Sequence, residues 1–325
     1  MIREIRDNTE LKRKVEDIIS YLCDSNGESV RLYFLIRNKN RKTLDITYSI
    51  LKSTISPDIG KELVNNGKLQ FLSLIEKGAE FIDYGILLSS DRDYIEKIRL
   101  GEVPYLKDII IACGRTENDT ISDDLFKKVW GYIIRVETEN ASLFLLKKSN
   151  ESKLLKKNGI ATRFKQGQFD KLNDQVVILD EDYDAALMIK EALADQEVLI
   201  FKRYPFESLL SFVEFYQAEI KSKIGFIKQK ALFDDTDGLI EICTKDGKKI
   251  RKLAKIIKGP IFNSINQSNI SQSITAYKLN VALDSTGKIK VSDSNIWDVF
   301  RIMDDDCVNS DISGNKYLAH GKMIV

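Results

Sequence analysis

The chain has 325 residues, 43% of them hydrophobic, which is enough apolar material for two domains with sizeable cores. Its 50 Lys and Arg residues balance its 49 Asp and Glu residues, so the net charge excludes neither nucleic acid nor protein as a partner. No apolar run reaches the roughly 18 residues that a spanning helix needs. The charged N-terminus also lacks a signal peptide's apolar segment, so we expect a cytoplasmic protein.

The first half of the chain begins with patterns of a helix and a hairpin. Apolar residues recur at helical spacing over residues 9–23. Residues 30–36 and 44–50 are rich in branched and aromatic side chains and flank a polar turn, which predicts two paired strands. Ser56-Pro57 then begins a helix, because serine caps helices and proline suits their first position.

Shorter patterns follow this helix, which we expect to end at Gly67. They predict strands at residues 84–88 and 108–113, a helix at 91–100, and a second hairpin of residues 130–136 and 141–146.

The composition changes at residues 147–171, where eight side chains are basic and only two are acidic. We therefore predict a domain boundary near residue 150, with one domain at 1–150 and the other at 151–325. Helical and strand patterns mix in both halves, so the predicted fold class is α+β, with mixed sheets and packed helices.

The second half is predicted to be richer in helices. Residues 181–193 fit a helix or a strand equally well, and residues 234–238 are expected to form a turn. The other predicted elements are strands at 176–179, 198–201, 288–291 and 317–325, and helices at 205–223, 247–258 and 296–303.

The common catalytic motifs are missing from the sequence. It has no P-loop, no dinucleotide-binding glycine motif and no Gly-x-Ser-x-Gly elbow. His320 is the single histidine, and the four cysteines are widely separated, which argues against a zinc site. We therefore predict no catalytic residue, no metal and no cofactor, and favour a binding protein over an enzyme.

Acidic clusters at residues 180–184 and 304–306 leave one enzymatic alternative open. Adjacent aspartates diverge on a strand or helix, so the clusters are more typical of solvated element ends than of metal sites. A metal-dependent nuclease that uses Asp180, Asp182 and Asp184 remains the alternative.

The predicted helix at 247–258 is strongly amphipathic. Ile250, Leu253, Ala254 and Ile257 form an apolar stripe that can dock on the protein body. A basic face of this kind can lie along a phosphate backbone and bind it without sequence specificity. A plain solvated face, an anionic membrane and an acidic protein partner remain alternatives. The candidate DNA-binding residues here are Lys248, Lys249, Arg251, Lys252, Lys255 and Lys258.

A second basic patch lies at residues 147–165, where Phe164 stands among the cations and Phe169 follows them. Aromatic rings beside lysines can stack on the bases of a single strand, although such rings more often belong to a core. The further candidate DNA-binding residues are Lys153, Lys156, Lys157, Arg163 and Lys165, and Lys147 and Lys148 adjoin them.

Residues 145–325 resemble the KwaB family. The resemblance rests on two apolar strand patterns that lead into Pro205 and on a closing pattern of helix, acidic turn, Ser-Gly and Tyr. The residues that carry it are Val176–Asp180, Val198–Phe201, Pro205–Leu210, Trp297, Arg301–Asp306, Ser310, Ser313-Gly314, Tyr317 and Lys322.

The resemblance implies a role in defence against phage. KwaB is the cytosolic component of the Kiwa system and pairs with KwaA, a small membrane protein. By resemblance, the chain is expected to bind phage DNA, to block replication or transcription, and to form a homo-oligomer, a dimer or larger. It would be recruited to the inner membrane face through KwaA. A protein-interaction sensor with no nucleic-acid role is the remaining alternative.

Overall fold

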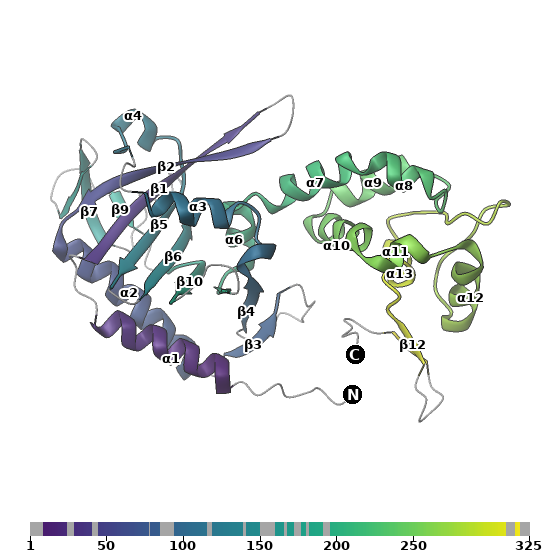
Figure 1. Ribbon diagram of the computed structural model, residues 1–325, viewed down its shortest axis with the longest axis horizontal. Coiled ribbons are helices and arrows are strands. Elements are labelled where there is room, and N and C mark those ends of the chain that lie inside the picture. The colour runs from purple at the N-terminus through teal and green to yellow at the C-terminus, as the bar shows by residue number, and fades with distance from the viewer. Residues whose placement is uncertain are drawn as a thin grey trace. The chain divides into compact units, whose positions relative to one another are not determined.

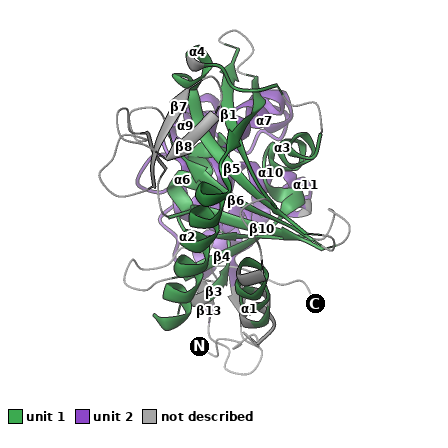
Figure 2. Ribbon diagram, turned by 90° about the vertical axis from the view of Figure 1, so that its left-hand side faces the viewer, with its two compact units in different colours: residues 1–211 green, residues 212–325 purple. Residues whose placement is uncertain are grey.

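The computed structural model has an α+β fold, as predicted, and divides into two compact units, residues 1–211 and 212–325 (Figure 2). The structure describes residues 9–24, 29–40, 45–77, 79–84, 94–115, 119–138, 141–149, 160–165, 168–171, 177–179, 182–190, 196–309 and 316–318.

Unit 1 is built on a mixed sheet (Figure 1). Its described strands run in the order β3-β4-β11-β10-β6-β5-β1-β2-β8-β7-β9. Pairing is antiparallel except between β3 and β4 and between β2 and β8. The strands are β1 Val30–Lys39, β2 Ile46–Ile55, β3 Glu80–Asp83, β4 Tyr94–Arg99, β5 Val129–Glu137, β6 Ser142–Lys148, β7 Ile160–Lys165, β8 Gln168–Lys171, β9 Val177–Leu179, β10 Ala185–Ile189 and β11 Glu197–Ile200.

Helices cover both faces of this sheet because its central strands are apolar on both sides. Ile134 of β5 belongs to the core that also contains residues of α1 (Thr9–Asp24) and α2 (Pro57–Glu76). The next residue, Arg135, points to the other face, since strand residues alternate. Its Nη1 donates to the carbonyl of Cys113 on α3 (Leu106–Cys113) at 3.3 Å. The short helices of this unit are η2 Leu100–Glu102, α4 Asp123–Phe126 and α6 Arg203–Leu209.

The structure confirms the first helix and both hairpins, but α2 is longer than predicted. Ser56 caps it, with the backbone N–H of Ile59 donating to the Ser56 hydroxyl, and the helix continues past Gly67 to Glu76. A Cβ at Gly67 would lie only 3.0 Å from Cδ1 of Leu145. The glycine therefore allows α2 to approach the sheet closely and does not end the helix.

Two elements of unit 1 have the opposite type to the one predicted. Residues 94–99, predicted as helix, form β4, because β11 and β3 pair with their backbone on either side. Residues 108–113, predicted as a strand, belong to α3. Ile95 and Ile98 have helical spacing, but both are buried in the sheet. Tertiary pairing therefore overrides the local pattern.

The structure divides the chain after Ser211 rather than near residue 150. The reason lies in the sheet, where β6 pairs antiparallel with β10 and Leu146 stands opposite Ala185. Strands on both sides of residue 150 therefore share one core. The predicted helix at 205–223 is instead broken at the new boundary, where Ser211 has a φ of 52°.

Unit 2 is mainly helical around one apolar core, which includes Phe262 and Phe300. The helix at 247–258 and the helix at 296–303 match the prediction. Residues 288–291, predicted as a strand, form only isolated bridges at Ile289. The elements are α7 Phe212–Ser222, α8 Ile224–Gln229, α9 Thr236–Thr244, α10 Gly247–Lys258, α11 Pro260–Ser264, α12 Gln267–Tyr277, α13 Ile296–Met303, β12 Cys307–Asn309 and β13 Lys316–Leu318.

None of the helices within the described residues has the length and apolar character required to cross a bilayer. The predicted turn at 234–238 contains the start of α9, where Asp235 accepts a hydrogen bond from the Gly238 N–H at 2.9 Å. The predicted terminal strand is described only at residues 316–318.

Candidate nucleic-acid interface

Helix α10 is fixed in unit 2 by its first turn and by its apolar side. The Asp246 carboxylate caps it by accepting the Lys248 N–H at 2.7 Å. A Cβ at Gly247 would lie 3.2 Å from Cγ2 of Val213, so the helix begins close against α7. The predicted apolar stripe, Ile250, Leu253, Ala254 and Ile257, is buried in the core, as is Ile256.

Four of the cations on α10 lie on one side of the helix, which we call the basic face: Lys248, Arg251, Lys255 and Lys258. They follow one another at spacings of three, four and three residues, which keeps them on one side at about 100° per residue. Lys248, Lys255 and Lys258 are exposed, and Arg251 is half-buried.

The other two cations of α10, Lys249 and Lys252, are held by carboxylates. Lys249 is buried, and its ammonium group forms an ion pair with Asp293 at 2.6 Å. The ammonium of Lys252 donates to carboxylates of Asp304 and Asp306, with the Asp306 contact at 3.1 Å. These contacts orient α10 on the body of unit 2, whereas Lys248, Lys255 and Lys258 of the basic face are exposed.

The acidic turn after α13 is shaped to hold Lys252. The Asp306 N–H bonds to the Arg301 carbonyl at 2.8 Å and the Asp305 N–H to the Ile302 carbonyl at 3.2 Å, while Asp305 has a φ of 51°. This is the Schellman pattern of a helix end. Burial alone would lower the pKa of Lys252, but the two carboxylates outweigh it and raise that pKa.

Lys258 of the basic face forms an ion pair with Glu219 of α7 at 2.7 Å. Its side chain is still 49% exposed. Lys248 and Lys255 form no ion pair with any residue that the structure describes.

The second predicted patch is only partly within the described residues. Lys153, Lys156 and Lys157 lie outside them. Arg163 and Lys165 lie on β7, opposite Asp170 and Gln168 of β8. The described part of this patch therefore belongs to unit 1, and α10 belongs to unit 2.

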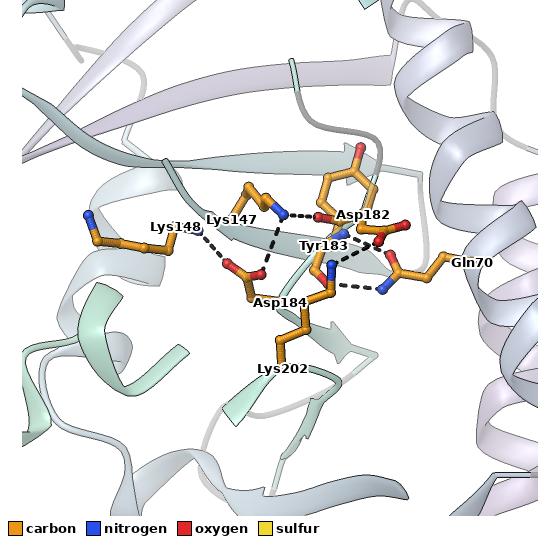
Figure 3. Close-up of polar contacts among 7 residues, drawn as sticks. All are labelled: Gln70, Lys147, Lys148, Asp182, Tyr183, Asp184 and Lys202. Atoms are coloured by element: carbon orange, nitrogen blue, oxygen red, sulfur yellow. Dashed lines mark hydrogen bonds and ion pairs between the residues drawn. The ribbon is translucent and has the colours of Figure 1, made fainter. Parts of the chain in front are cut away.

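Unit 1 contains a partly buried polar cluster whose ion pairs the sequence did not predict (Figure 3). Lys147 of β6 forms an ion pair with Asp184 at 3.5 Å, although these side chains are only 9% and 1% exposed. Lys202 pairs with Asp182 at 2.8 Å. The one signal in the sequence is that Lys147 ends an apolar strand and Asp184 immediately precedes another.

Gln70 of α2 also belongs to this cluster, because its side chain bonds to the backbone of Tyr183 as a neighbouring strand would. Its side-chain amide donates to the Tyr183 carbonyl at 2.9 Å, and its oxygen accepts the Tyr183 N–H at 2.8 Å (Figure 3). The Lys148 N–H donates to the Asp184 carboxylate at 2.5 Å. The backbone N–H and carbonyl of Tyr183 are therefore both satisfied by one side chain, while the N–H of Asp184 bonds to the carbonyl of Leu146 on β6.

The carboxylates of this cluster differ in their acid strength. Burial raises the pKa of Asp184, despite the opposing effect of Lys147. The hydrogen bond from Lys202 lowers the pKa of Asp182. Each is paired with its own lysine, and Asp180 lies outside the described residues. Within the part of the chain that is described, no three Cys, His, Asp or Glu side chains gather as metal ligands.

Two cysteine thiols on described helices, Cys113 and Cys243, are also buried. Cys113 and Cys243 lie in the cores of their units, and burial raises the pKa of both to about 12. Neither is poised as a nucleophile, since the thiolate is the reactive form. His320, the single imidazole, lies outside the described residues.

Comparison with known proteins identifies the family. No curated protein and no solved structure matches the chain significantly. The family model described as Kiwa protein KwaB-like matches residues 126–313, which is more than half of the chain. This match includes strands β5 to β11 of unit 1 and, in unit 2, α10 and the acidic turn. The chain belongs to the KwaB-like family and is a component of the Kiwa antiphage defence system.

Proposed function

We propose that this chain binds DNA without sequence specificity through the basic face of α10 and thereby blocks phage replication or transcription. The observation that carries the proposal is that Lys248, Arg251, Lys255 and Lys258 share one side of a helix whose opposite side is buried. Ten residues at 1.5 Å each separate the first and last of these cations by about 15 Å along the axis. That length suits several phosphates of a backbone.

The side chains of α10 favour phosphate contacts over base readout. The helix contains only apolar and basic residues after Gly247, so it has no amide side chain to read adenine, and Arg251 is its one side chain with the planar fork that suits guanine. Lysine ammonium groups contact phosphates as point charges and release condensed counterions. Binding by this face should therefore depend on salt and little on sequence.

The proposal also includes a partner and an assembly. Membership of the Kiwa system supports an interaction with the membrane protein KwaA, which would bring the chain to the inner membrane face. It also supports a homo-oligomer, in which several copies of α10 would bind one DNA molecule with greater avidity.

The direct test is charge reversal on the basic face, with Lys248→Glu and Lys255→Glu combined. Both side chains are exposed, so the fold should persist. We expect weaker binding of a labelled DNA duplex, and a slope of log K against log salt that is shallower by about 1.8, for two lost phosphate contacts. The matched control is Lys278→Glu with Lys290→Glu, two exposed lysines of unit 2 outside α10, which should leave the slope unchanged.

Equal loss in both double variants would point to general charge rather than to α10. A wild-type protein with no DNA affinity at physiological salt would overturn the proposed function. If such a protein still co-purified with KwaA, the result would favour a protein-interaction sensor.

A further inference from the structure

We infer that Asp304 and Asp306 limit the DNA affinity of α10 by holding Lys252 out of the basic face. This inference rests on the proposed function, because it concerns the same helix and the same ligand. It assigns a restraining role to the acidic turn after α13.

Lys252 stands where a fifth cation of the basic face would stand. It follows Lys248 by four residues and precedes Lys255 by three, so it neighbours both on the helix surface. Its side chain is nevertheless only 26% exposed, because its ammonium group is turned into the acidic turn.

The acidic turn is built to keep this position. Asp306 is buried, and the Schellman bonds at Asp305 and Asp306 fix the backbone between the two carboxylates. With both carboxylates on its ammonium group, Lys252 offers no net positive charge to a phosphate that approaches this flank.

Acids also border the face elsewhere. Asp293 holds Lys249 on the flank of Lys252, and Glu219 holds Lys258 at the far end of the helix. Release of a lysine by one of these carboxylates would therefore add a cation to the exposed pair Lys248 and Lys255. Lys252 is the candidate with the best position, since it adjoins two exposed cations.

The test is Asp304→Asn in the full-length protein, measured with a labelled DNA duplex over a range of salt concentrations. Asparagine keeps the shape and an acceptor oxygen but removes the charge. We expect tighter binding and a salt slope steeper by about 0.9, for one added phosphate contact. The ratio of the variant's DNA affinity to the wild-type affinity should then fall about threefold between roughly 50 and 200 mM salt.

A double variant assigns the gain to Lys252. Adding Lys252→Gln to Asp304→Asn should return the slope to the wild-type value, because the released cation is then missing. The matched control is Asp17→Asn, which frees Lys190 from an exposed ion pair of 2.7 Å in unit 1 and should leave the slope unchanged. Asp306→Asn makes the same charge change at the second carboxylate and should shift the slope in the same direction.

The outcomes separate this inference from the proposed function. If the wild type binds DNA but Asp304→Asn and Asp306→Asn bind equally or more weakly, the acidic turn only positions α10 and the inference is overturned. If the double variant keeps the gain, Lys252 is not its source. If the wild type itself does not bind, the proposed function fails first and the inference falls with it.

Discussion

Lys147 and Asp184 form the most deeply buried ion pair that the structure describes in unit 1. Removing two charges from water is costly, and only good geometry and additional hydrogen bonds offset that cost. Here the additional bonds come from the Lys148 N–H to Asp184 and from Lys147 to the Asp182 carbonyl. The pair joins β6 to the chain just before β10, so its role is structural cohesion of the sheet.

Lys147→Met should lower the free energy of unfolding by about 3–5 kcal/mol at neutral pH, because it leaves the Asp184 carboxylate buried and unpaired. Denaturant unfolding measures this loss. The matched control is Lys190→Met, whose exposed pair with Asp17 should be worth less than about 1 kcal/mol. Equal losses in the two variants would contradict a special role for the buried pair.

The Lys147→Met defect should shrink as the pH falls. Burial already raises the pKa of Asp184 above its unfolded value, and removing the lysine raises it further. A group whose folded pKa is raised is stabilising when protonated, and that stabilisation is lost as the pH rises through the folded pKa. Unfolding measured at neutral and mildly acidic pH should therefore show the variant recovering relative to wild type on the acidic side. A constant difference would argue against titration of Asp184.

At the scale of elements, helices of unit 2 end in turns that contain a residue with left-handed backbone conformation. Ala231 follows α8 with a φ of 50°, and Asp305 follows α13 with a φ of 51°. Left-handed conformation costs a residue with a Cβ roughly 1–2 kcal/mol, whereas glycine adopts it freely. Asp305 tolerates this position better than alanine, because short polar side chains are among the few found there.

Ala231→Gly should stabilise the protein by up to about 1 kcal/mol, since relief of the left-handed Cβ exceeds the entropy that glycine adds to the unfolded chain. Ala231 is exposed, so no packing is lost. Ala218→Gly, the same substitution inside α7, should instead destabilise by about 1 kcal/mol. Denaturant unfolding of the two variants should show opposite signs, and a loss in both would contradict the backbone argument.

At the scale of the whole molecule, each of the two units has an apolar core of its own. The core of unit 1 contains Leu145, and the core of unit 2 contains Leu253. Each unit has its own buried apolar side chains, which is the usual condition for independent folding.

Leu145→Ala and Leu253→Ala should therefore lower the midpoint temperatures of different thermal transitions. Each substitution should reduce the unfolding free energy of its own unit by about 2–5 kcal/mol. Scanning calorimetry of the full-length variants resolves this. Leu145→Ala should shift only the transition of unit 1, and Leu253→Ala only that of unit 2. A single transition that both variants shift equally would show that the units unfold as one body.

The sequence alone determined the elements whose signals are local. The helix at 247–258 could be placed because its apolar stripe repeats at helical spacing within a few residues. The two hairpins were found because each strand pairs with its neighbour along the chain. The family was also accessible, because its apolar and turn positions are read directly from the residues.

Tertiary structure alone decided what depends on distant partners. Lys249 and Lys252 look equivalent to Lys248 in the sequence, but carboxylates 44 and 52 residues away hold them. The apolar residues at 94–99 have the spacing of a helix, but these residues form a strand because β11 and β3 pair with them. The domain boundary was predicted near residue 150, but the structure divides the chain after Ser211, because β6 and β10 share a sheet. Periodicity records which face of an element is buried, and only the folded chain shows what meets that face.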